Sequence, residues 1–133
     1  MTSKVTYLGG LRTKNVHLQS GNSFVTDAPV DNNGKGEAFS STDTVATGFA
    51  NCMMTVMGIK ANGLDYNMEG TTAEVSKHMA TDPRRISKIE VIFNFPLEAD
   101  AKIRKILEHT AQTCPVHYSL HPDIEKAVTF NWK

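Results

Sequence analysis

The segment from residue 41 to 59 restricts the possible folds of this chain more than any other. Four apolar residues and a cysteine recur there at steps of four, three, four and three: Val45, Phe49, Cys52, Val56 and Ile59. This spacing is typical of one face of an amphipathic α-helix. Ser41 or Thr42 can cap the first turn, and Asp43 favours the positive end of the helix. The sequence therefore predicts a long helix with Cys52 on its buried face.

The rest of the chain predicts strands and a second helix. Strands are expected at 4–8, within 14–30 on either side of a turn at Ser20-Gly21-Asn22, at 65–80, 85–95 and near 127–132, and helices at 98–113 and 115–120. The clean alternation from Ile89 to Phe95 is typical of an antiparallel sheet with one wet face. Strands followed by a helix, twice over, indicate an α+β fold, in which a mostly antiparallel sheet packs on two main helices.

Length and composition suit one domain that spans residues 1–133. The chain has 133 residues, of which 40% are hydrophobic, and domains of this size are the commonest. One such protomer has only a modest core, and an intertwined homodimer would enlarge it. The formal net charge is zero, so we expect no nucleic-acid partner.

The start of the chain and its most apolar segment indicate a cytoplasmic location. No apolar run follows Lys4, as a secretory signal would require. The apolar segment 45–59 contains Thr47, Asn51 and Thr55 and is too short to cross a bilayer. We therefore expect no membrane partner.

Two cysteines are the candidate reactive groups. In a reducing compartment a transient catalytic disulfide is more plausible than a structural one, although two buried thiols that only pack remain an alternative. Cys114 lies eleven residues after Ile103, close to three helical turns. If the second helix reaches that far, Cys114 shares its apolar face, and both sulfurs can point into the space between the two helices.

A reactive thiol in such a place needs help to ionise. The thiolate is the nucleophile, whereas burial favours the neutral thiol. Cys52 lies too far inside its helix for the helix dipole to act, so a cation must stabilise the thiolate. Arg12, which follows Gly9-Gly10-Leu11, is the most suggestive candidate, because a guanidinium keeps its charge at neutral pH. Its alternative role is that of an ordinary surface residue.

Cys114 has a different local setting from Cys52. It precedes Pro115, a residue suited to the first position of a helix. Its sulfur is then expected near free backbone N–H groups, which lower the pKa of a thiol. Such a thiol would attack a sulfenic acid on Cys52 and form a disulfide, which an external dithiol would reduce. The alternative is that Cys114 is only a small capping residue.

Three segments, in order, resemble the osmotically inducible protein C (OsmC) / organic hydroperoxide resistance superfamily. The first comprises Gly10-Leu11-Arg12, Ser20-Gly21 and Thr26-Asp27-Ala28-Pro29, the second runs from Phe39 through Cys52 to Ile59, and the third is Cys114-Pro115-Val116-His117. The resemblance covers nearly the whole chain.

This resemblance implies an OsmC-like fold in an interwoven homodimer with two active sites at the interface. It also implies that Cys52 is the peroxidatic residue, Cys114 the resolving residue and Arg12 the partner of the Cys52 thiolate. The expected function is a thiol-dependent peroxidase that reduces organic hydroperoxides or hydrogen peroxide in oxidative-stress defence. Its expected reductant is a dithiol or a lipoylated protein, and we expect no cofactor.

The chain departs from the family pattern at one position. Members with peroxidase activity carry a Pro-Glu pair ten residues before the first cysteine, and the glutamate orients the arginine. Here Ser41-Thr42 occupies these positions. Glu37 and Asp43 are the nearby acids that can take over this role, and each is otherwise an ordinary solvated acid.

Two other functions compete with peroxide reduction. Cys114, His117 and His121 are spaced two and three residues apart and could form part of a zinc site, although our prediction is that no metal is bound. Alternatively, the protein is a non-enzymatic stress-response dimer that binds an apolar ligand between its helices. Aromatic and methionine side chains would line that pocket: Phe39, Phe49, Met53, Met54 and Met57.

Overall fold

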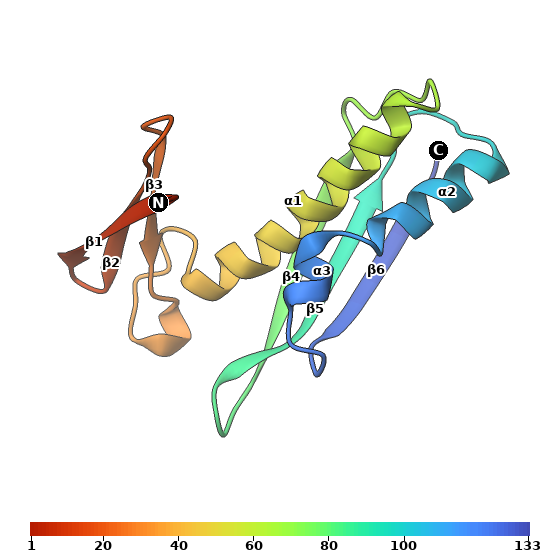
Figure 1. The fold of residues 1–133 in the computed structure, drawn as a ribbon. Coiled ribbons are helices and arrows are strands. Elements are labelled where there is room, and N and C mark those ends of the chain that lie inside the picture. Colours follow the sequence, from red (N-terminus) through yellow and green to blue (C-terminus); the bar gives the residue numbers. More distant parts are fainter. The chain divides into compact units, whose positions relative to one another are not determined.

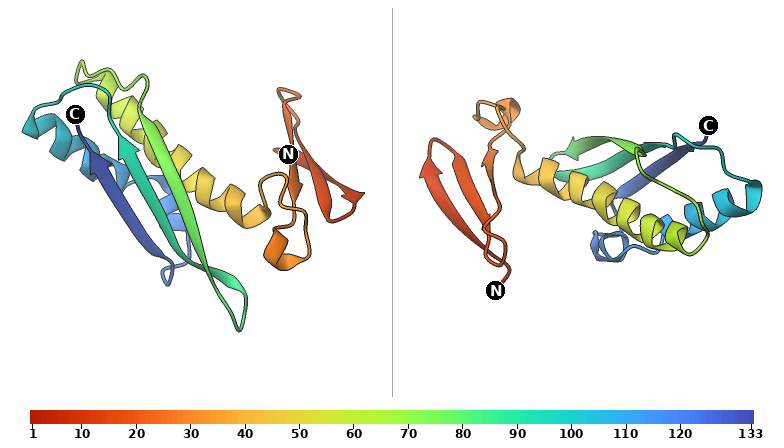
Figure 2. Two further views of the ribbon diagram at one scale, coloured as in Figure 1. Left: turned by 180° about the vertical axis from the view of Figure 1, so that it is seen from behind. Right: turned by 90° about the horizontal axis from the view of Figure 1, so that it is seen from above.

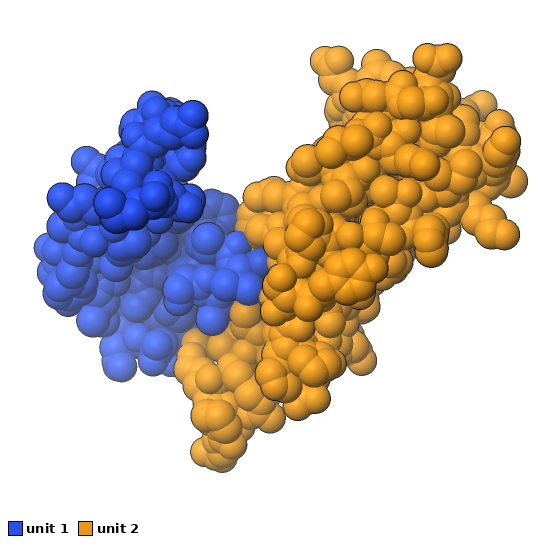
Figure 3. All heavy atoms as spheres, viewed as in Figure 1, with its two compact units in different colours: residues 1–45 blue, residues 46–133 orange.

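The computed structural model describes all residues from 1 to 133. The chain forms two compact units, Met1–Val45 and Ala46–Lys133, which Figure 3 shows in blue and orange. Each unit contains one three-stranded sheet. The α+β class is therefore confirmed, whereas the single domain over residues 1–133 and the intertwined dimer stay predictions.

The first unit contains an antiparallel meander of three strands in the order β1-β2-β3. These are β1 (Ser3–Gly9), β2 (Arg12–His17) and β3 (Ser23–Asp27), followed by the short 3₁₀ helix η1 (Val30–Asn32) (Figure 1). The turn between β1 and β2 has positive φ angles at Gly9, Gly10 and Leu11, a conformation that glycine adopts without strain. The predicted turn at Ser20-Gly21-Asn22 lies between β2 and β3, as expected.

The first unit buries no apolar side chain. Its only buried residues are Asp27 and Ser40. Large apolar side chains are instead exposed along it, among them Val5, Tyr7, Leu8, Leu11, Leu18, Phe24, Val30 and Phe39. Small sheets need a hydrophobic face packed against something to be stable. The first unit therefore has no apolar core of its own.

The second unit packs helices on one face of the sheet β4-β5-β6 (Figures 1 and 2). Its strands are β4 (Thr72–Ala80), β5 (Arg85–Asn94) and β6 (Glu125–Asn131), and its helices are α2 (Ala101–Ala111), α3 (Pro115–Ser119) and most of α1 (Ser41–Asn62). β4 and β5 are antiparallel, whereas β5 and β6 are parallel. The prediction of a mostly antiparallel arrangement is confirmed, since β5–β6 is the single parallel pair.

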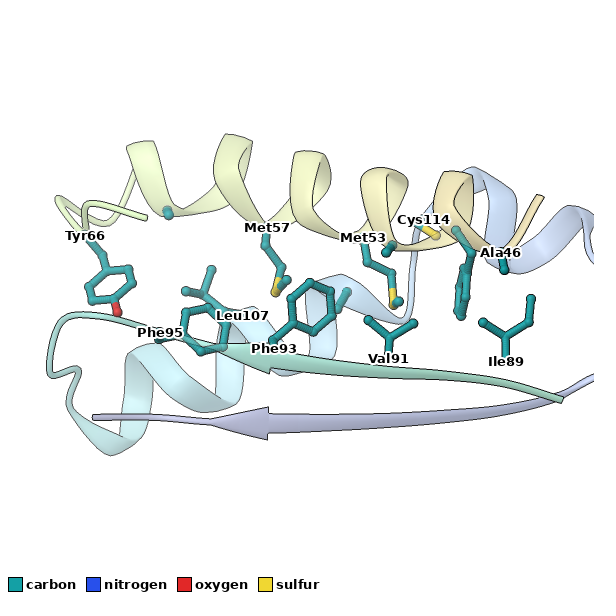
Figure 4. Packing of buried hydrophobic residues seen from close by; sticks show 14 residues of the cluster. Ala46, Met53, Met57, Tyr66, Ile89, Val91, Phe93, Phe95, Leu107 and Cys114 are labelled. Atoms are coloured by element: carbon teal, nitrogen blue, oxygen red, sulfur yellow. The ribbon is translucent and has the colours of Figure 1, made fainter. Parts of the chain in front are cut away.

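The core lies between this sheet and the helices α1 and α2 (Figure 4). Its buried members come from α1, β5, α2 and the flanking loops: Ala46, Phe49, Ala50, Met53, Met57, Ala61, Tyr66, Ile89, Val91, Phe93, Phe95, Leu107, Ala111 and Cys114. Each large apolar side chain contributes roughly 1.5–3 kcal/mol when fully buried. The core therefore fixes α1, and with it Cys52, on the sheet.

The prediction for the buried face of α1 is correct at Phe49, holds in part at Cys52 and Val56, and is wrong at Val45 and Ile59. The face that contacts the sheet carries Ala46, Phe49, Ala50, Met53, Met57 and Ala61. Val45 and Ile59 are 43% and 70% exposed, and Cys52 and Val56 are half-buried. The helix has apolar residues on two faces, and the branched residues of the exposed face give the stronger periodic signal.

The predicted cap of α1 is displaced by one residue. Ser40, rather than Ser41 or Thr42, caps the helix, because the N–H of Asp43 donates to Ser40 Oγ at 3.0 Å. In return, the N–H of Ser40 donates to Asp43 Oδ2 at 2.9 Å. This reciprocal pair satisfies two backbone donors at the helix start.

The second predicted helix is shorter than expected and stops before the second cysteine. Asp100 caps α2 by accepting the N–H of Ile103 at 2.8 Å, and the helix ends at Ala111. Cys114 is the N-cap of α3. The expectation that Cys114 continues the apolar face of α2 is therefore wrong, and its position depends on α3 instead.

Candidate active site

Cys52 lies on α1 at the border between two faces of the helix. Its neighbour Met53 is fully buried against the sheet, whereas Thr55 is exposed. Cys52 itself is half-buried and packs against the edge of the core. It is thus accessible enough to meet a small substrate and fixed enough to be oriented by its helix.

Cys114 is fully buried, with no exposed surface. As the N-cap residue of α3, it accepts the backbone N–H of His117 on Sγ at 3.2 Å. Pro115 occupies the first turn of that helix, where its missing N–H costs nothing. The Cys-Pro pair therefore holds the sulfur at the start of α3, as the sequence indicated.

Cys52 packs against the core cluster that contains Cys114 and is not linked to Cys114 by a disulfide. Burial raises the pKa of the Cys114 thiol, and Cys52, which lies near enough to act on it, raises it further. The N–H of His117 lowers it only in part. The expectation of a partly ionised Cys114 is therefore wrong, because removal from water outweighs the backbone donor.

Arg12 begins β2 directly after the glycine-rich turn. Its guanidinium Nη2 donates to Glu37 Oε2 at 2.8 Å and lies 3.4 Å from Asp27 Oδ2. Glu37 thus holds the arginine, as one of the two predicted supporting acids. These three residues belong to Met1–Val45 and the cysteines to Ala46–Lys133, and the pairing of Arg12 with the Cys52 thiolate stays a prediction.

Asp27 is a further partner of Arg12 that the sequence analysis did not identify. Its carboxylate is 2% exposed and accepts the backbone N–H of Glu37 at 3.0 Å. That N–H, together with the Arg12 guanidinium, lowers the pKa of Asp27 despite the opposing effect of burial. Its only signal in the sequence is its place within the segment Thr26-Asp27-Ala28-Pro29.

Asp43, the other candidate acid, has a structural role at the start of α1. Its carboxylate accepts the N–H of Ser40 and so closes the cap of the helix. An acid in the first turn also stabilises the positive end of a helix. A structural role as an acid in the first turn of the helix therefore accounts for the position of Asp43.

Neither competing site is assembled in the structure. No group of three histidine, cysteine or acidic side chains is placed to hold a metal ion, so the set Cys114, His117 and His121 does not converge. Phe49, Met53 and Met57 are fully buried core residues and line no open pocket. Of the other two residues predicted to line it, Phe39 is exposed and Met54 is half-buried.

Comparison with known proteins assigns the fold to a family. The sequence pattern of the OsmC-like proteins matches residues 34–128. The chain belongs to the OsmC-like family. This match includes Cys52 and Cys114, and it confirms the resemblance seen in the sequence. None of the proteins with curated functional descriptions matches the chain.

Solved structures of OsmC-like and related proteins share the fold. An osmotic stress induced and detoxification response protein from Psychrobacter arcticus 273-4 is 56% identical, with a TM-score of 0.96 over 98% of this chain and 96% of that one. An organic hydroperoxide resistance protein from Vibrio cholerae, with captopril in one of its active sites, is 16% identical, with a TM-score of 0.75 over 98% and 92%. An organic hydroperoxide resistance protein OsmC from Legionella pneumophila is 15% identical, with a TM-score of 0.73 over 98% of this chain and 97% of that one.

The helices of this OsmC-like protein give no indication of a membrane span. None of them combines the length and the apolar character that crossing a bilayer requires.

Proposed function

We propose that this OsmC-like protein is a cytoplasmic thiol peroxidase that reduces organic hydroperoxides, or hydrogen peroxide, in oxidative-stress defence. The observation that carries the proposal is the proximity of Cys52 to Cys114, since Cys52 packs against the core cluster that contains Cys114. These are the only two cysteines of the chain, they lie 62 residues apart (114 − 52), and one is accessible whereas the other is buried. An inert pair of packing thiols needs neither this proximity nor this division.

The reaction begins at the more accessible sulfur. The Cys52 thiolate attacks one peroxide oxygen, so that an S–O bond forms, the O–O bond breaks and the alcohol leaves with a proton. Cys52 becomes a sulfenic acid, and the peroxide is reduced. Cys114 then attacks the Cys52 sulfur, which forms the S–S bond and releases water. A dithiol, free or on a lipoylated protein, reduces the disulfide by exchange.

Arg12 supplies the positive charge that holds Cys52 as a thiolate in this proposal. Its hydrogen bonds to Glu37 and Asp27 support that role, because two carboxylates on the same nitrogen, Nη2, restrict the orientation of the guanidinium. Glu37 thereby replaces the glutamate that the family carries before its first cysteine. The acid comes from the loop after η1 and not from the start of α1.

We propose further that the protein is an interwoven homodimer. Two sets of exposed apolar residues support this assembly. One lies on the first unit, and the other lies on α1, where Val45 and Ile59 are exposed on either side of Cys52 in the sequence. Monomeric proteins rarely leave large contiguous apolar surface in water. A second copy of the chain is the partner that covers both.

The comparisons add support of two kinds. The Psychrobacter arcticus relative is described by osmotic stress and detoxification, and the more distant Vibrio cholerae protein by resistance to organic hydroperoxides. These relatives therefore support a general role in osmotic or oxidative stress defence. The finer steps at Cys52 and Cys114 depend on the chemistry of this chain.

Three variants test the proposal. Cys52→Ser should abolish peroxide consumption while the protein remains folded. Cys114→Ser should allow a sulfenic acid to form on Cys52, detectable with a dimedone-type probe, and should block the intramolecular disulfide. Arg12→Ala should raise the pH at which Cys52 is alkylated. Peroxide consumption by Cys52→Ser at the rate of the unmodified protein would refute the proposal.

A further inference from the structure

His117 lies between the two segments that carry the reactive sulfurs. Its backbone N–H donates to Cys114 Sγ at 3.2 Å. Its imidazole lies against the ring of Phe49 on α1, with 6.1 Å between the ring centroids and 34° between the planes. Phe49 precedes Cys52 by three residues, less than one helical turn. The imidazole therefore belongs to the first turn after Cys114 and contacts α1 less than one turn before Cys52.

One nitrogen of this imidazole is enclosed and unpaired. Nδ1 is buried and hydrogen-bonds to no group of the protein. Leaving a buried polar atom unpaired typically costs about 1–3 kcal/mol, so a protein rarely retains one without a reason. In the tautomer that carries its proton on Nε2, Nδ1 presents a free lone pair. The atom is then able to accept a proton.

The resolving step requires such a proton acceptor. Cys114 is buried and neutral, so its thiol must lose a proton as the sulfur attacks the Cys52 sulfenic acid. The leaving hydroxide must gain a proton at the same time. Away from water, a thiol of raised pKa transfers this proton slowly unless a neighbouring base accepts it. The structure offers no carboxylate or lysine for this purpose in contact with Cys114.

We propose that His117 is the proton carrier of the resolving step. As the Cys114–Cys52 bond forms and the S–O bond of the sulfenic acid breaks, His117 Nδ1 takes the thiol proton and passes it to the departing oxygen, which leaves as water. The imidazole ends the step unchanged. The proposal rests on the peroxidase function above and adds a residue to its mechanism.

The surroundings of His117 contain few other groups that can titrate. The ring of Tyr118 meets its ring edge-on, with 5.5 Å between centroids and 90° between planes, and that tyrosine is exposed. The thiols of Cys114 and, through it, Cys52 complete the set. His117 Nδ1 hydrogen-bonds to no acidic or basic side chain. A pH dependence that disappears with the imidazole therefore reports on this residue.

The test separates the two steps in a single turnover. The protein is mixed with one equivalent of an organic hydroperoxide, and sulfenic acid formation and disulfide closure are followed by rapid quench and mass spectrometry. His117→Gln keeps a polar side chain of similar size but does not carry protons. We expect normal sulfenic acid formation, disulfide closure slowed roughly a hundredfold, and loss of the increase of the closure rate with pH. His121→Gln, at an exposed histidine, is the matched control and should behave as the unmodified protein.

A second variant guards against a purely structural effect. His117→Ala removes the imidazole, and millimolar free imidazole should restore much of the closure rate. Closure by His117→Gln at the unmodified rate would overturn the proposal. So would a loss in His117→Ala that is equal at every pH and that free imidazole does not restore.

The failure of this inference differs from the failure of the proposed function. If Cys114→Ser forms no sulfenic acid on Cys52, the peroxidase function itself is refuted. If that sulfenic acid forms and His117→Gln closes its disulfide normally, the peroxidase function stands and only the role of His117 is lost.

Discussion

Arg12 Nη2 donates to Glu37 Oε2 at 2.8 Å, an ion pair that joins the first residue of β2 to the loop before α1. The OsmC-like peroxidases place their arginine-orienting glutamate ten residues before the first cysteine, where this chain has Thr42. In the proposed function, this ion pair supplies the orienting acid from a different position in the chain. Buried Asp27 adds a second carboxylate on the same guanidinium nitrogen.

Loss of these carboxylates should disturb Arg12 before it disturbs the fold. We expect Glu37→Gln combined with Asp27→Asn to slow peroxide reduction by roughly tenfold to a hundredfold, because small displacements of a positioning group have effects of this size. The rate of Cys52 oxidation under single-turnover conditions measures it. Glu69→Gln, at an exposed acid, is the control. An unchanged rate in the double variant would show that Arg12 needs neither acid.

The pH dependence of stability should reveal Asp27 separately. Its pKa is lowered in the folded chain, so the unfolded chain binds a proton more readily. The stabilisation is therefore present above the usual aspartate pKa of about 4 and is lost as the pH falls through the lower, folded value. Urea unfolding can be measured between pH 3 and pH 7 in steps of about one unit. At the acid end of this range, the free energy of unfolding should fall less steeply with decreasing pH in Asp27→Asn than in the unmodified protein. The same pH dependence of the unfolding free energy in both proteins would contradict the assigned environment of Asp27.

The Cys114 thiol should ionise at a higher pH than the thiol of an ordinary cysteine. In Cys52→Ser, the alkylation rate of Cys114 should have its pH midpoint above about 8.5, the value of a free thiol, since burial is the main cause of the shift. The unfolding free energy should also fall as the pH rises past that value, because the unfolded chain releases the thiol proton first. A midpoint at or below 8.5 would indicate an ionised thiol and remove the need for a proton carrier.

The exposed face of α1 should determine assembly. We expect Val45→Asp with Ile59→Asp to convert a dimer into a monomer in sedimentation experiments, because charges at a buried contact are costly. Lys102→Asp, exposed in the first turn of α2, is a control in which an acid is well tolerated. A dimer that survives both aspartates would place the interface elsewhere.

The core should respond as a packed interior. Met57 has no exposed surface and lies between α1 and β5 (Figure 4), so Met57→Ala should lower the free energy of unfolding by about 2–5 kcal/mol. Chemical denaturation followed by circular dichroism measures the change. A loss below about 1 kcal/mol, as is usual for surface positions, would show that the helix is only loosely packed on the sheet.

Local signals in the sequence located most elements, because each depends on nearby residues. The helix α1, the alternation in β5 and the start of α3 at Pro115 all follow from periodicity or from a single restricted residue. The buried face of α1 was assigned wrongly, since Ala46, Ala50 and Met53 face the sheet while the branched Val45 and Ile59 stay exposed. A helix with two apolar faces does not indicate which of them the chain itself covers.

The site was predicted less completely, because its contacts join distant segments. The pair Cys52–Cys114 was anticipated, yet for Cys114 the supporting argument was wrong, since α2 ends at Ala111. Asp27 was missed because an acid at a strand end is usually solvated. Only the fold places Asp27 beside Arg12. The direction of the Cys114 pKa shift likewise depends on a burial that no local pattern encodes.

The central claim concerns the two sulfurs and is tested most directly by peptide mass spectrometry. The reduced protein receives one equivalent of an organic hydroperoxide, is alkylated under acidic conditions and is digested without reductant. We expect a linked pair of peptides that contain Cys52 and Cys114, formed within one protein chain and reversed by a dithiol. Two freely alkylated cysteines with the peroxide unconsumed, or a disulfide that joins any other pair, would contradict it.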